Sequence, residues 1–188
     1  MKLFIKNMVC PRCITSVQQV FEGQGIAPVG VNLGEVVINE ELTEAELLQL
    51  KDVLAELGFE LLEDTKSQII ERVKSIIIAQ VQNGDGHIVF SDLLAGTLNK
   101  EYSSLSKVFS TNEGITIEQF IILQKIERVK ELLTYNQMTL SEIANVMGYS
   151  SVAHLSGQFR KITGYTPTNY KLLDDKLRLP LDGLAKKV

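Results

Sequence analysis

The sequence is poor in the residues that mark several protein classes. It has two cysteines, two histidines, four prolines and no tryptophan in 188 residues. Two cysteines cannot build the disulfide framework of a small secreted domain. Two histidines far apart, with no nucleophile motif, do not form a hydrolytic site, so we expect no enzyme. No apolar run is long enough to cross a bilayer and none near the start forms a signal peptide, so we expect a cytoplasmic protein without a membrane partner.

Negative charge is concentrated in the first third of the chain. Residues 1–64 contain eleven Asp/Glu against four Lys/Arg, whereas residues 65–188 contain twelve Asp/Glu against fifteen Lys/Arg. The overall charge of −4 therefore combines an acidic first part with a mildly basic second part. Residues 143–173 carry three cations and no carboxylate, which leaves a local basic surface where DNA could bind. This asymmetry predicts two domains with different partners.

Hydrophobic periodicity in the first part alternates between strand and helix patterns. Leu3 and Ile5 alternate with polar or exposed neighbours, and a helical repeat follows from residue 14 to residue 21. Alternation on both sides of Gly34 predicts a hairpin, and a capping box at Thr43 begins a second helix. A last short strand completes the order βαββαβ, which is the ferredoxin-like layout.

A Met-x-Cys-x-x-Cys motif follows the first predicted strand. Cys10 and Cys13 lie at the start of the predicted helix, where unpaired backbone N–H groups lower the pKa of a thiol. Two soft sulfur ligands suit Cu(I) better than Zn(II), which needs four ligands in a closed site. We therefore predict a soft metal ion on Cys10 and Cys13, with Met8 as a core residue or a weak third ligand.

The layout and the motif together resemble the heavy-metal-associated domain of copper chaperones and metal-pumping ATPases. The matching residues are Met8, Cys10 and Cys13, the Val-Asn-Leu at 31–33 and the Gly-Phe-Glu at 58–60. The loop departs from that family at Asn7, where glycine is common, and at Pro11-Arg12, where small residues are usual. The same cysteines also fit a thiol redox sensor, and the domain also fits a dimerisation or partner-binding module that holds no metal.

A helix-turn-helix pattern occupies residues 138–170. Thr139 and Glu142 form a capping box that starts a helix, and Gly148 ends it. Ser150 is placed to cap a second helix, which has the geometry of a helix that enters a major groove. The exposed side chains of that second helix are the predicted DNA contacts, namely Ser151, His154, Ser156, Gln158, Arg160 and Lys161.

This pattern resembles the second helix-turn-helix of the AraC family of transcription regulators. The matching residues are Ser-Glu-Ile-Ala at 141–144, Gly-Tyr-Ser at 148–150, Phe-Arg-Lys at 159–161 and Gly-Tyr-Thr-Pro-Thr-Asn-Tyr-Lys at 164–171. The sequence departs from the family at Gly157, where a polar or basic residue is usual, and at Leu155, where an aromatic residue is common.

Two further segments resemble the rest of the AraC-type DNA-binding domain. Predicted helices at 92–98, capped by Ser91, and at 100–109 resemble its first helix-turn-helix. A helix from Ile117 to about Thr134, capped by Thr116 with Gln119, resembles its connector, with Lys125 where the family usually has Arg. The exposed side chains of the second of these helices are additional predicted DNA contacts, namely Tyr102, Ser103, Ser104, Ser106 and Lys107.

The predicted fold is an α+β ferredoxin-like domain over residues 1–64 followed by an all-α double helix-turn-helix domain over residues 65–173. The tail, 174–188, matches no recognised pattern and is expected to be partly disordered. The resemblances imply a transcription regulator that binds double-stranded promoter or operator DNA. They also imply that its first domain senses a metal ion, Cu(I) in preference to Zn(II), or joins two copies into a homodimer.

Overall fold

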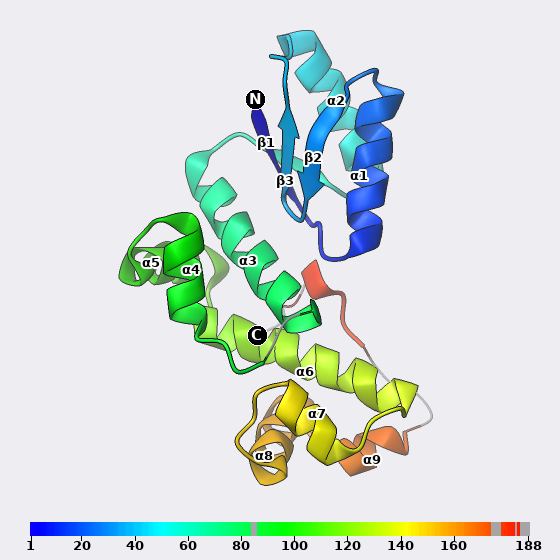
Figure 1. Cartoon of the computed structure of the whole chain (residues 1–188), viewed down its shortest axis with the longest axis vertical. Helices are drawn as coiled ribbons and strands as arrows, with labels where there is room; N and C mark the ends of the chain where they lie inside the picture. The colour runs from blue at the N-terminus through cyan, green and yellow to red at the C-terminus, as the bar shows by residue number, and fades with distance from the viewer. Residues whose placement is uncertain (84–85, 174–177, 183, 185–188) are drawn as a thin grey trace. The chain divides into compact units, whose positions relative to one another are not determined.

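The chain folds into two compact units, Met1–Ala79 and Gln80–Val188. The computed structural model describes residues 1–83, 86–173, 178–182 and 184, coloured from blue to red along the chain in Figure 1. Among these residues, no helix has both the length and the apolar character that a membrane crossing needs. The division between the units falls inside a helix, whereas the sequence pattern places a boundary after residue 64, where the last strand ends.

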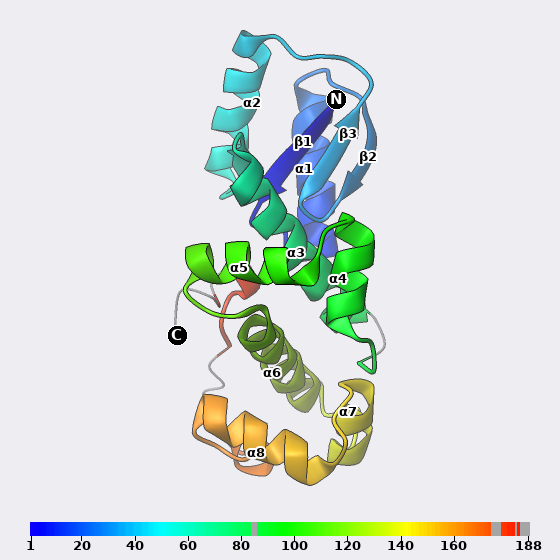
Figure 2. The same cartoon turned by 90° about the vertical axis from the view of Figure 1, so that its left-hand side faces the viewer.

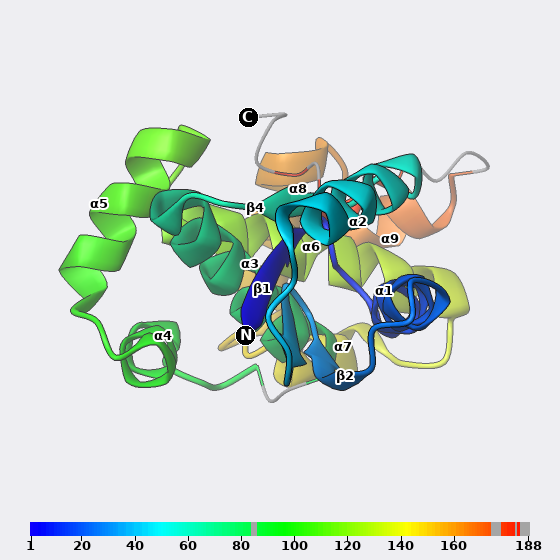
Figure 3. The same ribbon diagram turned by 90° about the horizontal axis from the view of Figure 1, so that it is seen from above.

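The N-terminal unit contains a four-stranded sheet in the order β2-β3-β1-β4, and every neighbouring pair is antiparallel. Two helices, α1 and α2, lie on one face of this sheet (Figure 3). The elements are β1 (Lys2–Lys6), α1 (Pro11–Gly23), β2 (Pro28–Asn32), β3 (Glu35–Ile38), α2 (Glu44–Glu56) and β4 (Glu60–Leu62).

Alternation along the strands explains the core of this unit. Leu3 and Ile5 of β1 point to the side of α1 and α2, where they are buried together with Phe21 and Leu54. Gly34, with φ +77°, makes the tight turn between β2 and β3. The predicted capping box at the start of α2 is present, so the local pattern found in the sequence is realised there.

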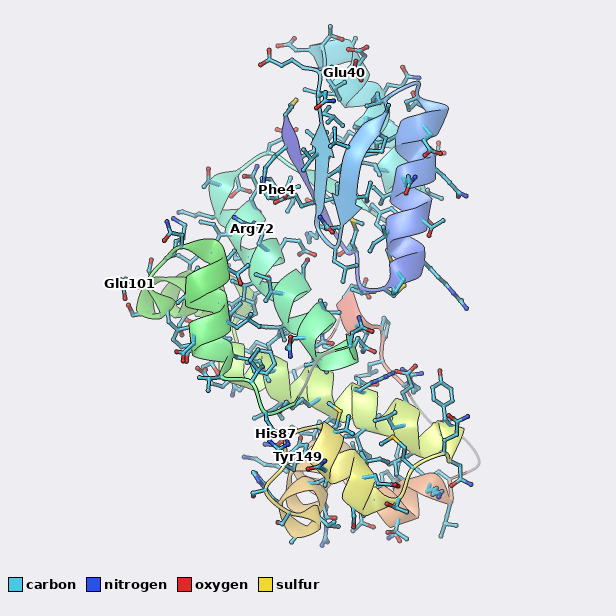
Figure 4. The ribbon with its side chains drawn as sticks, in the orientation of Figure 1. Phe4, Glu40, Arg72, His87, Glu101 and Tyr149 are labelled. Atoms are coloured by element: carbon cyan, nitrogen blue, oxygen red, sulfur yellow. The ribbon has the colours of Figure 1, made fainter. Side chains whose placement is uncertain are left out.

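A third helix, α3 (Thr65–Asn83), begins three residues after β4. The Asp64 carboxylate caps it by accepting hydrogen bonds from the backbone N–H groups of Lys66 and Ser67 at 3.0 and 2.9 Å. Its first turns cover the face of the sheet opposite α1 and α2, because the Arg72 guanidinium lies 5.9 Å from the ring centre of Phe4 (Figure 4). The sheet is therefore enclosed on both faces within the N-terminal unit.

The C-terminal unit is helical. Figure 2 shows α5 and α8 on either side of the long helix α6. Beyond the last turn of α3, the helices are α4 (Phe90–Leu98), α5 (Tyr102–Glu113), α6 (Ile117–Tyr135), α7 (Leu140–Val146), α8 (Val152–Thr163) and α9 (Pro167–Lys171).

The structure corrects two predicted helix caps. Helix α4 begins at Phe90 with Val89 as its N-cap, and Ser91 lies inside its first turn. The N-cap of α8 is Ser151 rather than Ser150, and its hydroxyl accepts from the His154 backbone N–H at 3.1 Å. In both cases the predicted N-cap is one or two residues from the observed one. The apolar spacing of a helix fits several neighbouring start positions, so it does not fix the first residue.

Part of the tail packs on α6, and the expectation of partial disorder in residues 174–188 stays a prediction. The Gln124 amide donates to the Leu181 carbonyl at 3.0 Å, and the Glu127 carboxylate accepts from the Leu179 backbone N–H at 3.1 Å. Glu127 is 2% exposed and also pairs with Lys130 at 2.5 Å. Burying such polar groups requires partners, and the tail backbone supplies two of them. Residues 174–177, 183 and 185–188 lie outside the described residues.

We expect deletion of residues 178–188 to destabilise the C-terminal unit by about 2 to 4 kcal/mol, since it removes one hydrogen bond to a buried charge and one to a buried amide. All five tyrosines belong to this unit and the chain has no tryptophan, so tyrosine fluorescence during urea unfolding reports on it alone. Deletion of only residues 185–188 is the control, because it keeps Leu179 and Leu181. A loss below about 0.5 kcal/mol would show that the tail is not part of the folded unit.

Candidate nucleic-acid interface and thiol site

The second helix-turn-helix consists of α7, the turn at Gly148 and α8. Gly148 has φ +70°, a left-handed conformation that costs little only for glycine. Ile143 on α7 packs inward with Leu155 and Phe159 on α8, and all three are fully buried. This core fixes the orientation of α8, so packing determines which side chains of α8 face outward.

The predicted contact residues of α8 differ in exposure. Arg160 and Lys161 are exposed in the last turn of the helix, and His154 and Ser151 are exposed near its start. Ser156 and Gln158 are half-buried. The cations are therefore the residues of this helix best placed to reach phosphate groups.

Internal hydrogen bonds occupy part of the polar face of α8. The Tyr149 hydroxyl donates to the Gln158 side-chain oxygen at 2.6 Å, and burial raises the pKa of Tyr149 to about 12. The His154 ring lies edge-on to Tyr149 and its Nδ1 is 3.1 Å from the Ser150 hydroxyl. Gln158 therefore has its amide N–H₂ group left for a base, and His154 has Nε2 left.

Helix α5 carries the other predicted contacts. Ser103, Ser104 and Lys107 are exposed, and Ser106 is half-buried. Tyr102 differs from them, because its hydroxyl donates to the Glu118 carboxylate at the start of α6. Burial and this carboxylate raise the pKa of Tyr102 above its usual range. Tyr102 thus ties α5 to α6, and its role as a DNA contact stays a prediction.

A junction around Lys125 holds the turn of the second helix-turn-helix against the segment before α4. The Lys125 ammonium of α6 donates to the Met147 carbonyl at 2.7 Å and to the Gly86 carbonyl at 3.3 Å. The Gly86 backbone N–H donates to the Val146 carbonyl at 3.2 Å. His87 and Tyr149, labelled in Figure 4, mark the two sides of this junction. The sequence showed an unusual lysine here, but not its partners, which lie 22 and 39 residues away.

The cysteine motif lies at the N-terminal end of α1. Cys10 is the N-cap residue, Cys13 lies in the first turn, and their sulfur atoms are 3.5 Å apart. Both side chains are partly exposed, whereas Met8 is fully buried in the core and is not accessible as a ligand. Two sulfurs at this separation can bind one ion at about 2.3 Å each, with a bent S–metal–S angle. Thiolate donors of this kind suit a soft ion, and a linear two-ligand site would require the two sulfurs to move apart.

The two thiols have different environments. Partial burial raises the pKa of Cys10, but hydrogen bonds from Cys13 and the nearby Arg12 lower it more, so the net pKa lies below its usual value. Burial raises the pKa of Cys13. Among the described residues, no cluster of three or more His, Cys, Asp or Glu side chains could hold a metal ion. A closed four-ligand Zn(II) site is therefore not formed by the described part of one chain.

The match to a family model lies in the C-terminal unit. A family model described as a helix-turn-helix domain matches residues 94–172. The chain is 32% identical over 69 residues to the probable transcriptional regulator LumQ of Photobacterium leiognathi, which is 37% of this chain and 28% of that protein. It is 29% identical over 139 residues to the Msm operon regulatory protein of Streptococcus mutans, which is 71% of this chain and 48% of that protein.

Among solved structures, the C-terminal domain of AraT, a response regulator from Geobacillus stearothermophilus, has a TM-score of 0.50. The match is 24% identical and covers 58% of this chain and 88% of the AraT domain. At this identity the likeness concerns the fold alone. The residues of this chain that match the helix-turn-helix model, 94–172, lie within the same C-terminal unit. Two helix-turn-helix segments, α4 with α5 and α7 with α8, are joined by α6. The chain spans less than half the length of the two curated relatives described above, whose names describe them as a probable transcriptional regulator and an operon regulatory protein.

Proposed function

We propose that this chain is a sequence-specific transcription regulator that binds double-stranded DNA through α5 and α8. The observation that carries the proposal is the match over residues 94–172, which includes the second half of α4, all of α5, the connector α6 and the second helix-turn-helix. Helices inserted into successive major grooves lie about 34 Å apart along the duplex, so one chain could read two sites. Lys107, Arg160 and Lys161 would contact phosphates, and Ser103, His154 and Gln158 would contact base edges.

We further propose that the N-terminal unit is a ferredoxin-like, heavy-metal-associated domain that binds Cu(I) through Cys10 and Cys13. The strand order, the helices on one face of the sheet and two accessible sulfurs 3.5 Å apart support this proposal. A bound ion would fix the distance between the two sulfurs and reduce the charge at the start of α1. The resulting change in the loop would alter the affinity of the C-terminal unit for DNA.

The test is DNA binding by the full chain, using an operator selected from a random-sequence library. We expect addition of Cu(I) to shift the dissociation constant by about 5- to 150-fold relative to the chelated protein, which is the usual range for coupled sites. The double variant Cys10→Ser/Cys13→Ser should bind the operator like the chelated protein and should not respond to Cu(I). Fluorescence anisotropy at fixed salt measures both quantities.

Each alternative gives a different result in the same assay. A response to a thiol oxidant without a response to Cu(I) or Zn(II) would identify a redox sensor. No response to either, together with normal operator binding, would identify a module that holds no metal. A Zn(II) response that appears with dimer formation would indicate a site built from four thiolates of two chains. Failure to select any DNA sequence would overturn the regulator itself.

A further inference from the structure

Glu71 of α3 makes direct contact with the loop that carries the cysteines. Its carboxylate accepts a hydrogen bond from the backbone N–H of Asn7 at 3.1 Å, although the two residues are 64 positions apart in the sequence. Glu71 is only 5% exposed. A hydrogen bond to a buried carboxylate is among the stronger ones in a protein, so this contact fixes the position of the loop relative to α3.

The loop segment from Asn7 to Cys10 is short and held at several points. Asn7 has φ +73°, a left-handed conformation, and its side-chain amide donates to the Gly58 carbonyl at 2.8 Å. Met8 is fully buried in the core. These contacts leave the segment little freedom to absorb a movement of the Cys10 sulfur. Such a movement would therefore shift the Asn7 peptide.

Helix α3 is the covalent path between the two units. It runs without interruption from Thr65 to Asn83, and the division between the units falls after Ala79. Its first half packs on the sheet through Arg72 against Phe4 and through Ser75, whose hydroxyl lies against Gly34. A displacement at Glu71 therefore acts on a packed helix, and the C-terminal end of that helix belongs to the C-terminal unit.

We propose that Glu71 is a positioning residue that transmits the state of the Cys10 and Cys13 thiols to α3. This inference rests on the proposed metal response and names the contact that carries it. Ion binding that changes the separation of the sulfurs would shift the Asn7 peptide, and the Glu71 hydrogen bond would pass this shift to α3. Loss of the acceptor would leave both sites intact but uncoupled.

The test compares Glu71→Met, which keeps the size of the side chain but removes the acceptor, with the wild-type chain. We expect Glu71→Met to bind one Cu(I) per chain and to bind the operator, when chelated, with unchanged affinity. Its Cu(I)-dependent shift in operator affinity should fall to within about twofold of no shift, against the 5- to 150-fold range expected for coupled sites. Hydrogen exchange of the α3 amides should respond to Cu(I) in the wild type and not in the variant.

Two further variants serve as controls. Arg72 lies next to Glu71 on α3, and Arg72→Met removes its contact with Phe4 of β1 but leaves the cysteine loop untouched. This variant should keep the full Cu(I)-dependent shift in operator affinity. Glu71→Gln retains an acceptor oxygen, so it should restore part of the shift, and it replaces Glu71→Met if that variant does not fold.

The outcomes separate this inference from the proposed function. A wild-type shift that Glu71→Met retains in full would overturn the role of Glu71 and leave metal sensing in place. Equal loss of the shift in Arg72→Met would also overturn it, because α3 packing in general would then be responsible. Absence of any shift in the wild type would overturn the proposed metal response and this inference with it.

Discussion

Reversal of the two exposed cations of α8, in the double variant Arg160→Glu/Lys161→Glu, is expected to weaken operator binding by at least about 100-fold near 0.1 M salt. The reason is that both side chains are exposed at one end of α8, where they would neutralise phosphates and release counterions. Each lost phosphate contact also weakens the dependence of binding on salt. The negative slope of log K against log salt should therefore become shallower by about 2 units. A salt titration of fluorescence anisotropy measures affinity and slope together.

A charge-matched control distinguishes a local contact from the effect of net charge. Lys2→Glu/Lys51→Glu changes the charge by the same amount on the N-terminal unit, where both lysines form exposed ion pairs of the kind that contribute little to stability. We expect it to change operator affinity by less than about threefold at this salt concentration, because distant exposed charges are screened. Equal losses in the two double variants would show that α8 does not contact the phosphate backbone.

The largest loss of stability is expected for Gly148→Ala. A β-carbon at residue 148 would lie 2.0 Å from the Gly86 carbonyl oxygen, which is backbone and cannot rotate away. The left-handed φ of +70° adds about 1 to 2 kcal/mol for a residue other than glycine. The two backbones must separate, and this weakens the hydrogen bonds that Lys125 donates across the junction. We expect a total loss of about 3 to 5 kcal/mol in the free energy of unfolding of the C-terminal unit.

Gly157→Ala is the matched control for this substitution. Gly157 lies inside α8, is exposed, has helical backbone angles and would place its β-carbon in open space. Alanine at such a position should stabilise the helix by up to about 1 kcal/mol. Urea unfolding followed by tyrosine fluorescence should thus move in opposite directions for the two variants. Similar stabilities would mean that the segment before α4 does not pack against this turn.

Local patterns were sufficient to predict most of the helices and strands. Thr43, Thr116 and Thr139 were each expected to form a capping box with a residue three positions later, and all three boxes are present. The second helix-turn-helix was also expected, with Gly148 ending its first helix, and the first was expected from its resemblance to the AraC-type domain. These features involve residues within one or two helical turns, so the information needed to place them is contiguous in the sequence.

Which polar groups remain available for DNA could not be predicted in this way. Tyr102 and Gln158 were both expected to contact DNA, yet Tyr102 bonds Glu118 and Gln158 accepts from Tyr149. The first partner lies 16 residues away and belongs to a different helix. A periodic pattern identifies the exposed face of a helix, but it does not identify hydrogen bonds with neighbouring elements.

The sequence by itself determined most of the helices, three of their capping boxes, the cysteine spacing and the resemblance of the second half to a DNA-binding domain, because these depend on residues close together in the chain. Only the tertiary structure decided three other features: the packing of the tail on Gln124 and Glu127, the Lys125 junction, and the contact of Asn7 with Glu71. Their partners are separated by 22 to 64 residues. Such pairs join polar groups on elements that only the folded chain brings together, so local sequence patterns do not reveal them.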